Sequence, residues 1–400
     1  KPKVNNRSAV HVVTGGQFGS EAKGAVTAAL VRRMRHENPQ RQITNVRVGG
    51  PNAGHTAYDT QGRAWALRQI PQCAVIDDPL VLLAVAPGSE IDLRVLYDEV
   101  HRLETAGLPV LNRLAVSADA TLLTDVHHER ERQTDLSGRI GSTGKGIGAA
   151  RADRILRNAL TLRVVEHPDC ASKLDEAYPG LSDQIHADGM FDSLTDFLCQ
   201  LQLIPAGWAW TSVLEAGDVV VEGTQGYGLG LHTKYYPTVT SSDCTALNWL
   251  QMADIVPWAP WVGEIRVWVV LRPYPIRVAG NSGPLLEETT WEQLGLPAEQ
   301  TTVTHKTRRV GGWDARLARD AVEANGGGLS NTNVVVAFTM ADQVVPELAG
   351  RTSTDGLAED ARKALDEWVM RIQDSTGARV AYVGTGPNSY VWQAASEEAF

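Results

Sequence analysis

The sequence has few cysteines, no long apolar run and no excess of positive charge. The four cysteines, at positions 73, 170, 199 and 244, form no CxxC pair, so we interpret them as reduced, buried or incidental thiols. No apolar run approaches the ~20 residues of a membrane span, and the polar start has no signal-peptide core. Asp and Glu (47) outnumber Lys and Arg (37), which argues against a protein that coats nucleic acid. We therefore expect a cytoplasmic protein.

The chain is long enough, and apolar enough, to bury a sizeable core. It has 400 residues, of which 43% are hydrophobic, so no disulfide or metal is needed to hold it together. We find neither an internal repeat nor a low-complexity linker, and we expect one domain with insertions over residues 1–400. Four of the eleven tryptophans fall within residues 249–268. We interpret that cluster as packing or as a dimer face.

Apolar β-branched runs alternate with helical patterns along the chain, which predicts an α/β fold with a mainly parallel sheet. Glycine, threonine and aspartate follow several of the runs, and ligands collect at the carboxyl ends of parallel strands. The predicted strands are residues 9–14, 80–86, 219–221, 265–271, 334–338 and 380–383. The predicted helices are residues 23–34, 93–106 and 359–376.

The first glycine-rich loop reads GGQFGSEAKG at residues 15–24 and leads into a predicted helix. Glycines let backbone N–H groups approach a phosphate, and a helix N-terminus adds its dipole. Lys23 can pair with phosphate as a point charge. The spacing is not that of a Walker A motif, which disfavours a generic P-loop kinase. A structural turn is the alternative for this loop.

Two more loops combine glycine with polar groups. In GGPNAGHT, residues 49–56, His55 has a near-neutral ordinary pKa that suits acid catalysis. In GSTGKGIG, residues 141–148, hydroxyls and a cation suit a monophosphate, and arginines 151, 154 and 157 follow on a predicted helix. A structural histidine and a flexible basic loop are the respective alternatives.

The remaining two segments carry groups that can read a base and a carboxylate. EGTQG, residues 222–226, offers Gln225, whose amide has a donor and an acceptor in one plane. TTVTHKTRRVG, residues 301–311, offers Arg308 and Arg309, and a guanidinium can bind a carboxylate through two parallel hydrogen bonds. A strand-end turn and a solvated basic loop are the alternatives.

Taken in order, these segments resemble those of the adenylosuccinate synthetases. The family's loops read GxQWGDEGKGK, GGxNAGHT, GTTxxGIGP, EGAQG…YPxVTSS and TTGRxRRxGW, and the matches run from about residue 12 to about residue 387. The forms EGTQGYGL and TVT are similar to the archaeal branch. The resemblance implies a large mainly parallel sheet with helices on both faces, related to the P-loop NTPases. It also implies a carbon–nitrogen ligase of purine biosynthesis that uses GTP, Mg²⁺ and L-aspartate.

The resemblance also assigns candidate residues. Positions that match the family's catalytic residues are Ser20, His55, Lys23 and Gln225. Positions that match its NTP-binding residues are Gly19, Glu21, Ala22, Lys23, Gly24, Gly54, His55, Thr56, Asp342, Gly384, Thr385 and Gly386. Those for the purine monophosphate are Ser20, Asn52, Ser142, Thr143, Arg157, Gln225, Thr240, Val278 and Lys306. Those for aspartate are Thr302, Val303, Thr304 and Arg308, and those for the metal are Ser20 and Gly54.

Several of these matches carry a specific role in the family. His55 matches the general acid at the purine's 6-oxygen, and Gly54 matches the glycine whose carbonyl binds Mg²⁺. Arg157 matches the arginine that reaches into the partner subunit's nucleotide site, so the resemblance implies a homodimer. Asp342 matches the carboxylate that reads the guanine of GTP.

Ser20 departs from the family pattern, which has aspartate there. That aspartate is the presumed base at the purine's ring nitrogen 1, and it is also a Mg²⁺ ligand. The ordinary pKa of a serine hydroxyl is far too high for serine to act as that base. The substitution removes a charge and opens space where guanine carries its 2-amino group. It resembles the phage branch of the family, the aminodeoxyadenylosuccinate synthetases, which use dGMP and aspartate on the route to diaminopurine DNA. Lys306, where the family has arginine, fits a substrate that lacks the 2′-hydroxyl.

The sequence therefore favours a ligase for dGMP and L-aspartate, in the host cytoplasm if a phage encodes it. GTP is the expected phosphate donor because Asp342 can accept from the ring N–H and amino group of guanine; ATP and dATP are the alternatives. Two other functions stay open. One is an IMP-dependent adenylosuccinate synthetase that tolerates Ser20. The other is a non-catalytic nucleotide-binding homologue.

Overall fold

A computed structural model describes residues 7–301, 305–328 and 331–393. Its main sheet has ten strands in the order β16-β15-β14-β11-β1-β10-β2-β5-β7-β9. In chain order these are β1 (Ser8–Gly15), β2 (Ile43–Arg47), β5 (Val81–Val85), β7 (Leu114–Ser117), β9 (Gln202–Ile204), β10 (Asp218–Gly226), β11 (Val262–Leu271), β14 (Val334–Phe338), β15 (Val380–Gly386) and β16 (Ser389–Trp392). Pairs of short strands are β3 (His55–Tyr58) with β4 (Ala64–Leu67), β6 (Glu90–Ile91) with β8 (Thr121–Leu122), and β12 (Ile276–Arg277) with β13 (Arg309–Val310).

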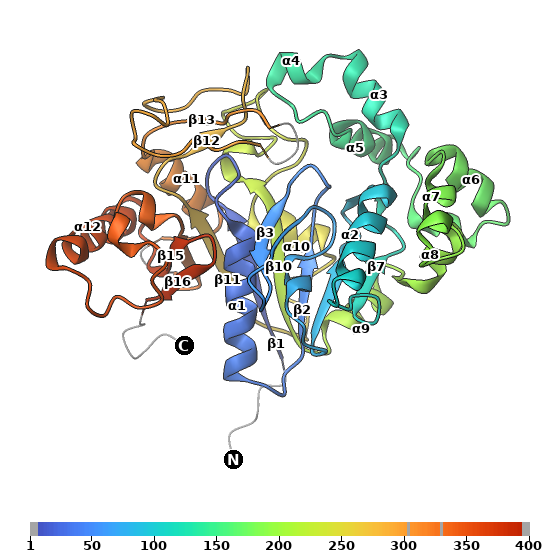
Figure 1. Ribbon diagram of the computed structural model, residues 1–400, viewed down its shortest axis with the longest axis horizontal. Helices are drawn as coiled ribbons and strands as arrows, with labels where there is room; N and C mark the ends of the chain where they lie inside the picture. Colours follow the sequence, from blue (N-terminus) through green and yellow to red (C-terminus); the bar gives the residue numbers. More distant parts are fainter. Residues whose placement is uncertain (1–6, 302–304, 329–330, 394–400) are drawn as a thin grey trace. The chain divides into compact units, whose positions relative to one another are not determined.

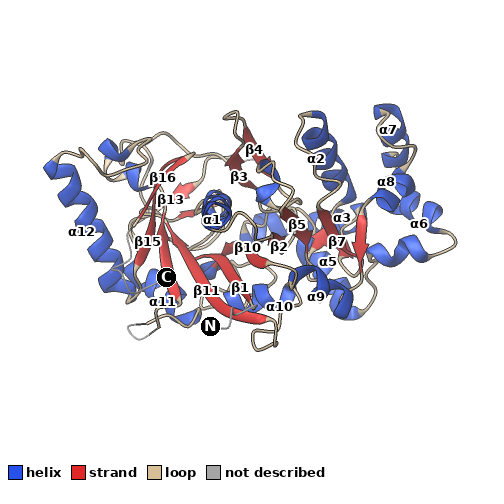
Figure 2. Cartoon of the chain, turned by 90° about the horizontal axis from the view of Figure 1, so that it is seen from below, coloured by secondary structure: helices blue, strands red, loops and turns tan. Residues whose placement is uncertain are grey.

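Twelve α-helices accompany these strands within the described residues (Figures 1 and 2). They are α1 (Lys23–Glu37), α2 (Leu93–Thr105), α3 (Asp125–Gln133), α4 (Leu136–Ile140), α5 (Ile147–Leu156), α6 (Cys170–Ala177), α7 (Leu181–Asp188), α8 (Leu194–Gln200), α9 (Trp208–Leu214), α10 (Ala246–Met252), α11 (Ala315–Ala324) and α12 (Glu359–Thr376). Large, mainly parallel and accompanied by helices, the sheet confirms the predicted α/β fold.

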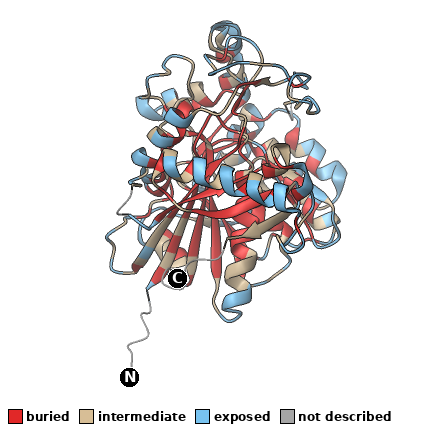
Figure 3. Ribbon diagram, turned by 90° about the vertical axis from the view of Figure 1, so that its left-hand side faces the viewer, coloured by how far each residue is buried: buried red, intermediate tan, exposed pale blue. Residues whose placement is uncertain are grey.

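The strands are apolar because they are buried on both faces, as parallel strands are when helices cover the sheet. All five residues of β14, VVVAF, are buried, and the last five of β11 are buried too. The strands stand out as the buried part of the molecule in Figure 3. The helix α2 shows the complementary pattern, since its buried leucines and valine recur at helical spacing and Asp92 caps its N-terminus through the Arg94 amide.

The chain divides into two compact units. The first unit contains Thr27–Glu222 and Trp249–Glu264 together with the N-terminal residues to Val10. The second unit contains His11–Val26, Gly223–Asn248 and Ile265–Phe400. The expectation of one domain with insertions stays a prediction.

In the first unit, β10, β2, β5, β7 and β9 pair in parallel. In the second unit, β11, β14 and β15 pair in parallel, and β16 runs antiparallel at the edge. The helix α12 packs against both α11 and β15 in that unit (Figure 2). Parallel pairing brings the carboxyl ends of neighbouring strands to the same edge. The first and second candidate loops follow β1 and β2, and the fourth is the end of β10, whereas the third follows α4 and the fifth includes β13.

The tryptophans of residues 249–268 do not share one environment. Trp249 and Trp268 are buried, as expected for packing, whereas Trp258 is 83% exposed. Trp268 contacts the edge strand β16 through an edge-to-face contact with Trp392. Within the described residues, no helix has both the length and the apolar character that crossing a membrane requires. All four cysteines are free thiols.

Candidate active site

The first glycine-rich loop, in the second unit, is built around a buried carboxylate. The backbone amides of Gln17 and Gly19 donate to Glu21 Oε1 at 3.1 and 2.9 Å, and Lys23 Nζ donates to Glu21 Oε2 at 2.8 Å. Glu21 is fully buried and Lys23 is 3% exposed. The conformation of the loop is therefore held by its own glutamate, and Lys23 begins the helix α1.

Ser20 sits at a strained position in that loop. Its φ of 58° and that of Ala22, 67°, lie in the left-handed region that L-residues seldom adopt. The Ser20 carbonyl accepts a hydrogen bond from Arg272 Nη1 at 3.0 Å, and Ser20 itself is half-buried. The hydrogen bond from Arg272 thus fixes the backbone of Ser20, the residue that departs from the family pattern. Gly24, another candidate of this loop, is buried in the first turn of α1.

Gln225 lies against the first loop. A Cβ on Gly15 would stand 2.4 Å from the Gln225 carbonyl oxygen, so only glycine allows this approach. The Gly228 amide donates to the Gln17 carbonyl at 2.8 Å. The Oε1 of Gln225 is buried and has no hydrogen-bond partner among the residues that the structure describes. A buried acceptor without a partner can accept a hydrogen bond from a bound base, which fits the role predicted for Gln225.

The other purine and aspartate candidates of the second unit lie on loops. Thr240 is half-buried, and its amide donates to the Leu229 carbonyl at 2.8 Å. Val278 follows β12 and is half-buried, whereas Lys306 is exposed and its amide donates to Thr301 Oγ1 at 3.1 Å. The predicted aspartate-binding residues Thr302, Val303 and Thr304 lie outside the described residues.

Arg308 belongs to a partly buried ion cluster that the sequence did not predict: Arg272 is fully buried, whereas Arg308 and Glu299 are half-buried. Glu299 binds Arg272 through two hydrogen bonds, of 2.5 and 3.1 Å, and Arg308 Nη1 stands 3.4 Å from Glu299 Oε2. Burial by itself raises the pKa of Glu299, but the two arginines outweigh it and the pKa is lowered. One feature of the sequence could have indicated this cluster: the charged residue Arg272 directly follows the apolar run of β11.

The residues expected to surround the donor base come together in the second unit. Thr339 Oγ1 donates to the Glu21 carbonyl at 2.7 Å, which ties the end of β14 to the first loop. A Cβ on Gly384 would lie 3.1 Å from Thr339 Cα, so the end of β15 packs beside it. Asp342 is half-buried, and burial raises its pKa. The Thr385 hydroxyl is bound within the protein, to the Arg351 carbonyl at 2.6 Å.

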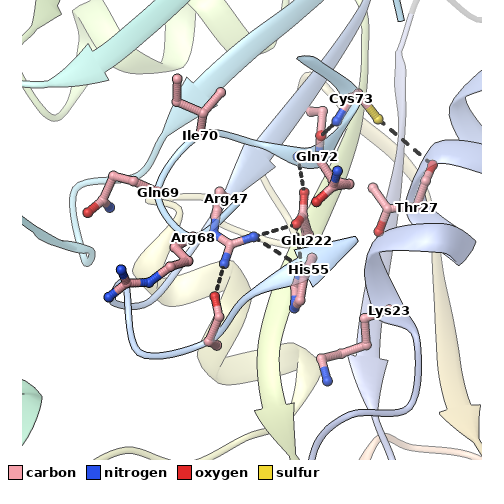
Figure 4. Close-up of polar contacts among 12 residues, drawn as sticks. Lys23, Thr27, Arg47, His55, Arg68, Gln69, Ile70, Gln72, Cys73 and Glu222 are labelled. Carbon is pink, nitrogen blue, oxygen red and sulfur yellow. Dashed lines mark hydrogen bonds and ion pairs between the residues drawn. The ribbon is translucent and has the colours of Figure 1, made fainter. Parts of the chain in front are cut away.

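In the first unit, His55 lies in a buried network with Arg47 and Glu222 (Figure 4). Its Nδ1 is 2.5 Å from Glu222 Oε1 and 3.0 Å from Arg47 Nη1, and Arg47 Nη1 donates to Glu222 Oε1 at 2.7 Å. Glu222 Oε2 accepts from the Gln72 amide at 2.9 Å, and Arg47 Nη2 donates to the Ala53 carbonyl at 2.5 Å. Sequence reasoning assigned no role to Arg47 or Glu222.

The network determines which ring nitrogen of His55 can exchange a proton. Burial by itself raises the pKa of the Glu222 carboxyl, but the charge of Arg47 and hydrogen bonds from His55 and Gln72 lower it to about 2. Glu222 is therefore a carboxylate and can only accept, so Nδ1 of His55 carries the proton that it donates. The proton that a general acid releases must then come from Nε2, while the carboxylate stabilises the imidazolium.

The loop that carries His55 is packed against the third loop. A Cβ on Gly50 would stand 2.3 Å from Cδ1 of Ile147, the first residue of α5. Asn52 is half-buried, and its Oδ1 has no hydrogen-bond partner in the part of the chain that the structure describes. Gly54 and Thr56 are exposed. The first unit thus brings the second and third loops together.

In the third loop, an internal carboxylate occupies the amides at the start of α5. Glu131 accepts from the amides of Gly146 and Gly148 at 2.9 and 3.2 Å. Ser142 is half-buried, and its Oγ accepts from the Gly144 amide, whereas Thr143 is exposed. A nucleotide phosphate in this loop would therefore meet the hydroxyls of Ser142 and Thr143 rather than those two amides.

Arg157 ends the helix α5 and faces solvent. Its φ is 64°, and its amide donates to the Arg154 carbonyl, which closes the helix in a left-handed cap. Ile155 and Leu156, the two residues before it in the chain, are 70% and 63% exposed, so large apolar side chains are exposed at the end of this helix. No other candidate of the first unit within the described residues combines such exposure with a charge.

The two oxygen donors assigned to Mg²⁺ lie in different units, Gly54 in the first and Ser20 in the second. Within the described ranges, no three His, Cys, Asp or Glu side chains gather into a metal-binding group. The Gly54 carbonyl and the Ser20 hydroxyl are neutral oxygens, which Mg²⁺ accepts when a nucleotide supplies phosphate oxygens. The chemistry of these donors is thus compatible with a metal that arrives with its nucleotide.

Comparison with known proteins identifies the family of the chain. The family model for adenylosuccinate synthetase matches residues 12–344. The adenylosuccinate synthetase of Pyrococcus sp. (strain ST700) is 32% identical over 381 residues, which cover 94% of this chain and 95% of that protein. That of Methanocaldococcus jannaschii is 31% identical over 385 residues, which cover 95% of this chain and 94% of that protein.

Two solved structures share the fold over nearly the whole chain. The cyanophage S-2L succinoaminodeoxyadenylate synthetase, bound to dGMP and to dATP as an energy donor, matches with a TM-score of 0.72 at 25% identity over 98% of this chain and 97% of that one. The fully ligated adenylosuccinate synthetase of Plasmodium falciparum matches with a TM-score of 0.73 at 20% identity, over 96% of this chain and 100% of that one. The chain therefore belongs to the adenylosuccinate synthetase family of carbon–nitrogen ligases.

Proposed function

We propose that this ligase joins L-aspartate to the 6-position of dGMP, with GTP as the phosphate donor. The products are 2-amino-2′-deoxy-adenylosuccinate, GDP and phosphate, and the reaction would serve diaminopurine DNA synthesis in a phage. The observation that carries the proposal is Ser20, a small neutral side chain held in a fixed loop where the family has aspartate. The cyanophage neighbour, which was determined with dGMP, supports the same substrate.

The proposed chemistry has two steps. The purine's 6-oxygen attacks the γ-phosphorus of the donor, GDP leaves, and the proton of the ring nitrogen passes to a phosphate oxygen or to a water beside Ser20. The aspartate amine then attacks carbon 6, the C–O bond breaks, and phosphate leaves. Lys23 offsets phosphate charge in the first step, and His55 protonates the departing oxygen from Nε2 in the second. Most of the acceleration would come from positioning and from charge stabilisation.

The remaining residues bind and orient. Gln225, with its orphaned Oε1, would accept from an N–H of the purine edge. Arg308 would bind a carboxylate of aspartate, and Ser142 and Thr143 the nucleotide's phosphate. Ser20 and Gly54 would hold Mg²⁺ alongside the phosphate oxygens, and the ion would neutralise charge that develops during phosphoryl transfer.

Arg157 supports the proposal of a homodimer. The exposed Ile155 and Leu156 offer apolar surface at the end of α5, which a second copy of the chain would cover. A guanidinium beside that surface can reach a phosphate across the interface. In this proposal each nucleotide site is completed by the partner's Arg157.

IMP is the rival substrate because the archaeal relatives, 31–32% identical, are named adenylosuccinate synthetases. dATP is the rival donor because the cyanophage structure holds it as the energy donor. Asp342 favours GTP, since a carboxylate accepts from two N–H groups of guanine and adenine has no such pair on its ring edge.

Phosphate release tests the proposal directly. The purified chain is mixed with aspartate, Mg²⁺ and GTP, and each purine monophosphate is supplied in turn. We expect release that requires both dGMP and aspartate, with a dGMP kcat/KM at least about tenfold that of IMP, which corresponds to 1.4 kcal/mol. Equal or better turnover of IMP would overturn the dGMP proposal, and binding without turnover of any monophosphate would indicate a non-catalytic homologue. Replacing GTP by dATP in the same assay decides the donor.

A further inference from the structure

Glu299 joins three loops of the second unit, each of which carries a candidate site residue. Its carboxylate binds Arg272, whose Nη1 also donates to the Ser20 carbonyl. It stands 3.4 Å from Arg308 Nη1 and 3.4 Å from Gln343 Nε2, and Gln343 follows Asp342. Neither the family resemblance nor the comparisons assign a role to Glu299.

The two arginines bind the Glu299 carboxylate differently, and the distances between their nitrogens and its oxygens show this. Arg272 is fully buried and takes the carboxylate in a two-point ion pair, so its charge is compensated inside the protein. Arg308 touches the same carboxylate once, at the outer limit of hydrogen-bond length. Its Nε is buried and lacks a hydrogen-bond partner among the described residues. Most of the donor capacity of Arg308 is therefore uncommitted.

Two further hydrogen bonds fix the backbone of Arg308. Its amide donates to the Glu299 carbonyl at 2.8 Å, and its own carbonyl accepts from the Trp291 indole at 2.8 Å. Two guanidinium groups and one carboxylate leave a single positive charge in the cluster. One carboxylate group of a ligand would complete that balance, and the Nε edge of a guanidinium is suited to a two-point contact with it.

We propose that Glu299 is the positioning residue of the carboxylate site: it compensates Arg272 and orients Arg308 so that the free edge of the Arg308 guanidinium receives one carboxylate of aspartate. This inference rests on the proposed function. A competing role would make Glu299 an internal rival of the substrate for Arg308. The two roles predict opposite changes in aspartate affinity when the charge of Glu299 is removed.

The test compares Glu299→Gln with Glu292→Gln, a matched change at an exposed glutamate of the same connecting segment. We expect Glu299→Gln to raise the KM for aspartate roughly tenfold or more, the scale of one charged hydrogen bond. The KM for the phosphate donor should change less than about twofold, and Glu292→Gln should behave as the wild type does. Glu299→Asp keeps the charge and should recover part of the loss.

A double-mutant cycle separates positioning from general damage. If Glu299 acts through Arg308, then Glu299→Gln should add little to the aspartate KM of an Arg308→Lys variant. A lowered or unchanged aspartate KM in Glu299→Gln, or equal changes in every KM together with a lower melting temperature, would overturn the inference. The wild type and Glu292→Gln are measured in the same assay. If both turn over, the proposed function holds, and a negative result for Glu299→Gln contradicts only the inference about Glu299.

Discussion

At the scale of single residues, the proposed choice of purine depends on Ser20. Its left-handed backbone and the hydrogen bond from Arg272 to its carbonyl fix where any side chain at this position begins. A serine there leaves the room, and the neutral acceptor, that a 2-amino group needs. An aspartate would add a negative charge and two more heavy atoms at the same starting point.

Ser20→Asp should therefore shift the substrate preference from dGMP toward IMP. We expect the ratio of the two kcat/KM values to change by roughly tenfold or more, because the carboxylate favours the purine without a 2-amino group and crowds the purine that carries one. Ser20→Ala serves as the control, since it removes the hydroxyl without adding charge and should weaken dGMP turnover with no improvement for IMP. An unchanged preference in Ser20→Asp would contradict the role given to this residue.

Glu222 makes a prediction about acid stability. Its folded pKa of about 2 lies below the ordinary 4.5, so its ionisation stabilises the fold above pH 4.5 and that contribution is lost as the pH falls toward 2. Glu222→Gln leaves Arg47 uncompensated and should cost about 3–5 kcal/mol near neutral pH. The free energies of unfolding of the variant and the wild type should converge between pH 4.5 and 2. Urea titrations at several pH values measure this, with the exposed Glu215→Gln as control, and a constant difference across the window would contradict it.

At the scale of elements, the first and fourth loops of the second unit fit together only through glycine. A Cβ on Gly226 would stand 2.4 Å from Glu21 Oε1 and 2.5 Å from the Gln17 carbonyl oxygen. Those are the groups that give the phosphate loop its shape, and neither can withdraw without breaking hydrogen bonds. The packing of β10 against this loop is therefore part of the candidate site.

Gly226→Ala should displace the phosphate loop and raise the KM for the donor nucleotide, by roughly tenfold if one charged hydrogen bond is lost. Gly356→Ala is the control, because open space surrounds it and only its φ of 69° opposes a side chain, at about 1–2 kcal/mol. Steady-state kinetics with the donor varied and a melting curve for each variant provide the measurement. A normal donor KM in Gly226→Ala would refute the argument from packing.

The elements also show how far the sequence could predict the structure. Apolar runs such as VVVAF identified their strands, and the glycine-rich loops identified most of the candidate residues. The strand β2, ITNVR, was missed because three of its five residues are polar, so the segment lacks the apolar run expected of a buried strand. All five residues are nevertheless buried. Its pairing with β10 sets Arg47 opposite Glu222, 175 residues away, and no local pattern fixes such a register. The contact between Arg272 and Glu299 was missed as well, because no local pattern pairs two loop residues that lie 27 positions apart.

At the scale of the whole molecule, the proposed homodimer allows two inactive variants to restore each other. Arg157→Ala removes the guanidinium that each protomer would contribute to the nucleotide site of its partner. His55→Asn removes the general acid of a protomer's own site. In a mixed dimer, the Arg157→Ala protomer keeps its own His55 and receives the intact Arg157 of the partner subunit. That one site should work, whereas no site in either parent dimer should.

Random exchange in an equal mixture makes half of the dimers mixed, each with one working site, so about a quarter of the wild-type activity should return. Activity is measured before and after the two variants are co-incubated with nucleotide and aspartate. Sedimentation of the wild type under the same conditions shows whether it is a dimer. A monomer in sedimentation, or no recovery although mixed dimers form, would refute the shared site, because each protomer would then have to complete its nucleotide site from its own chain.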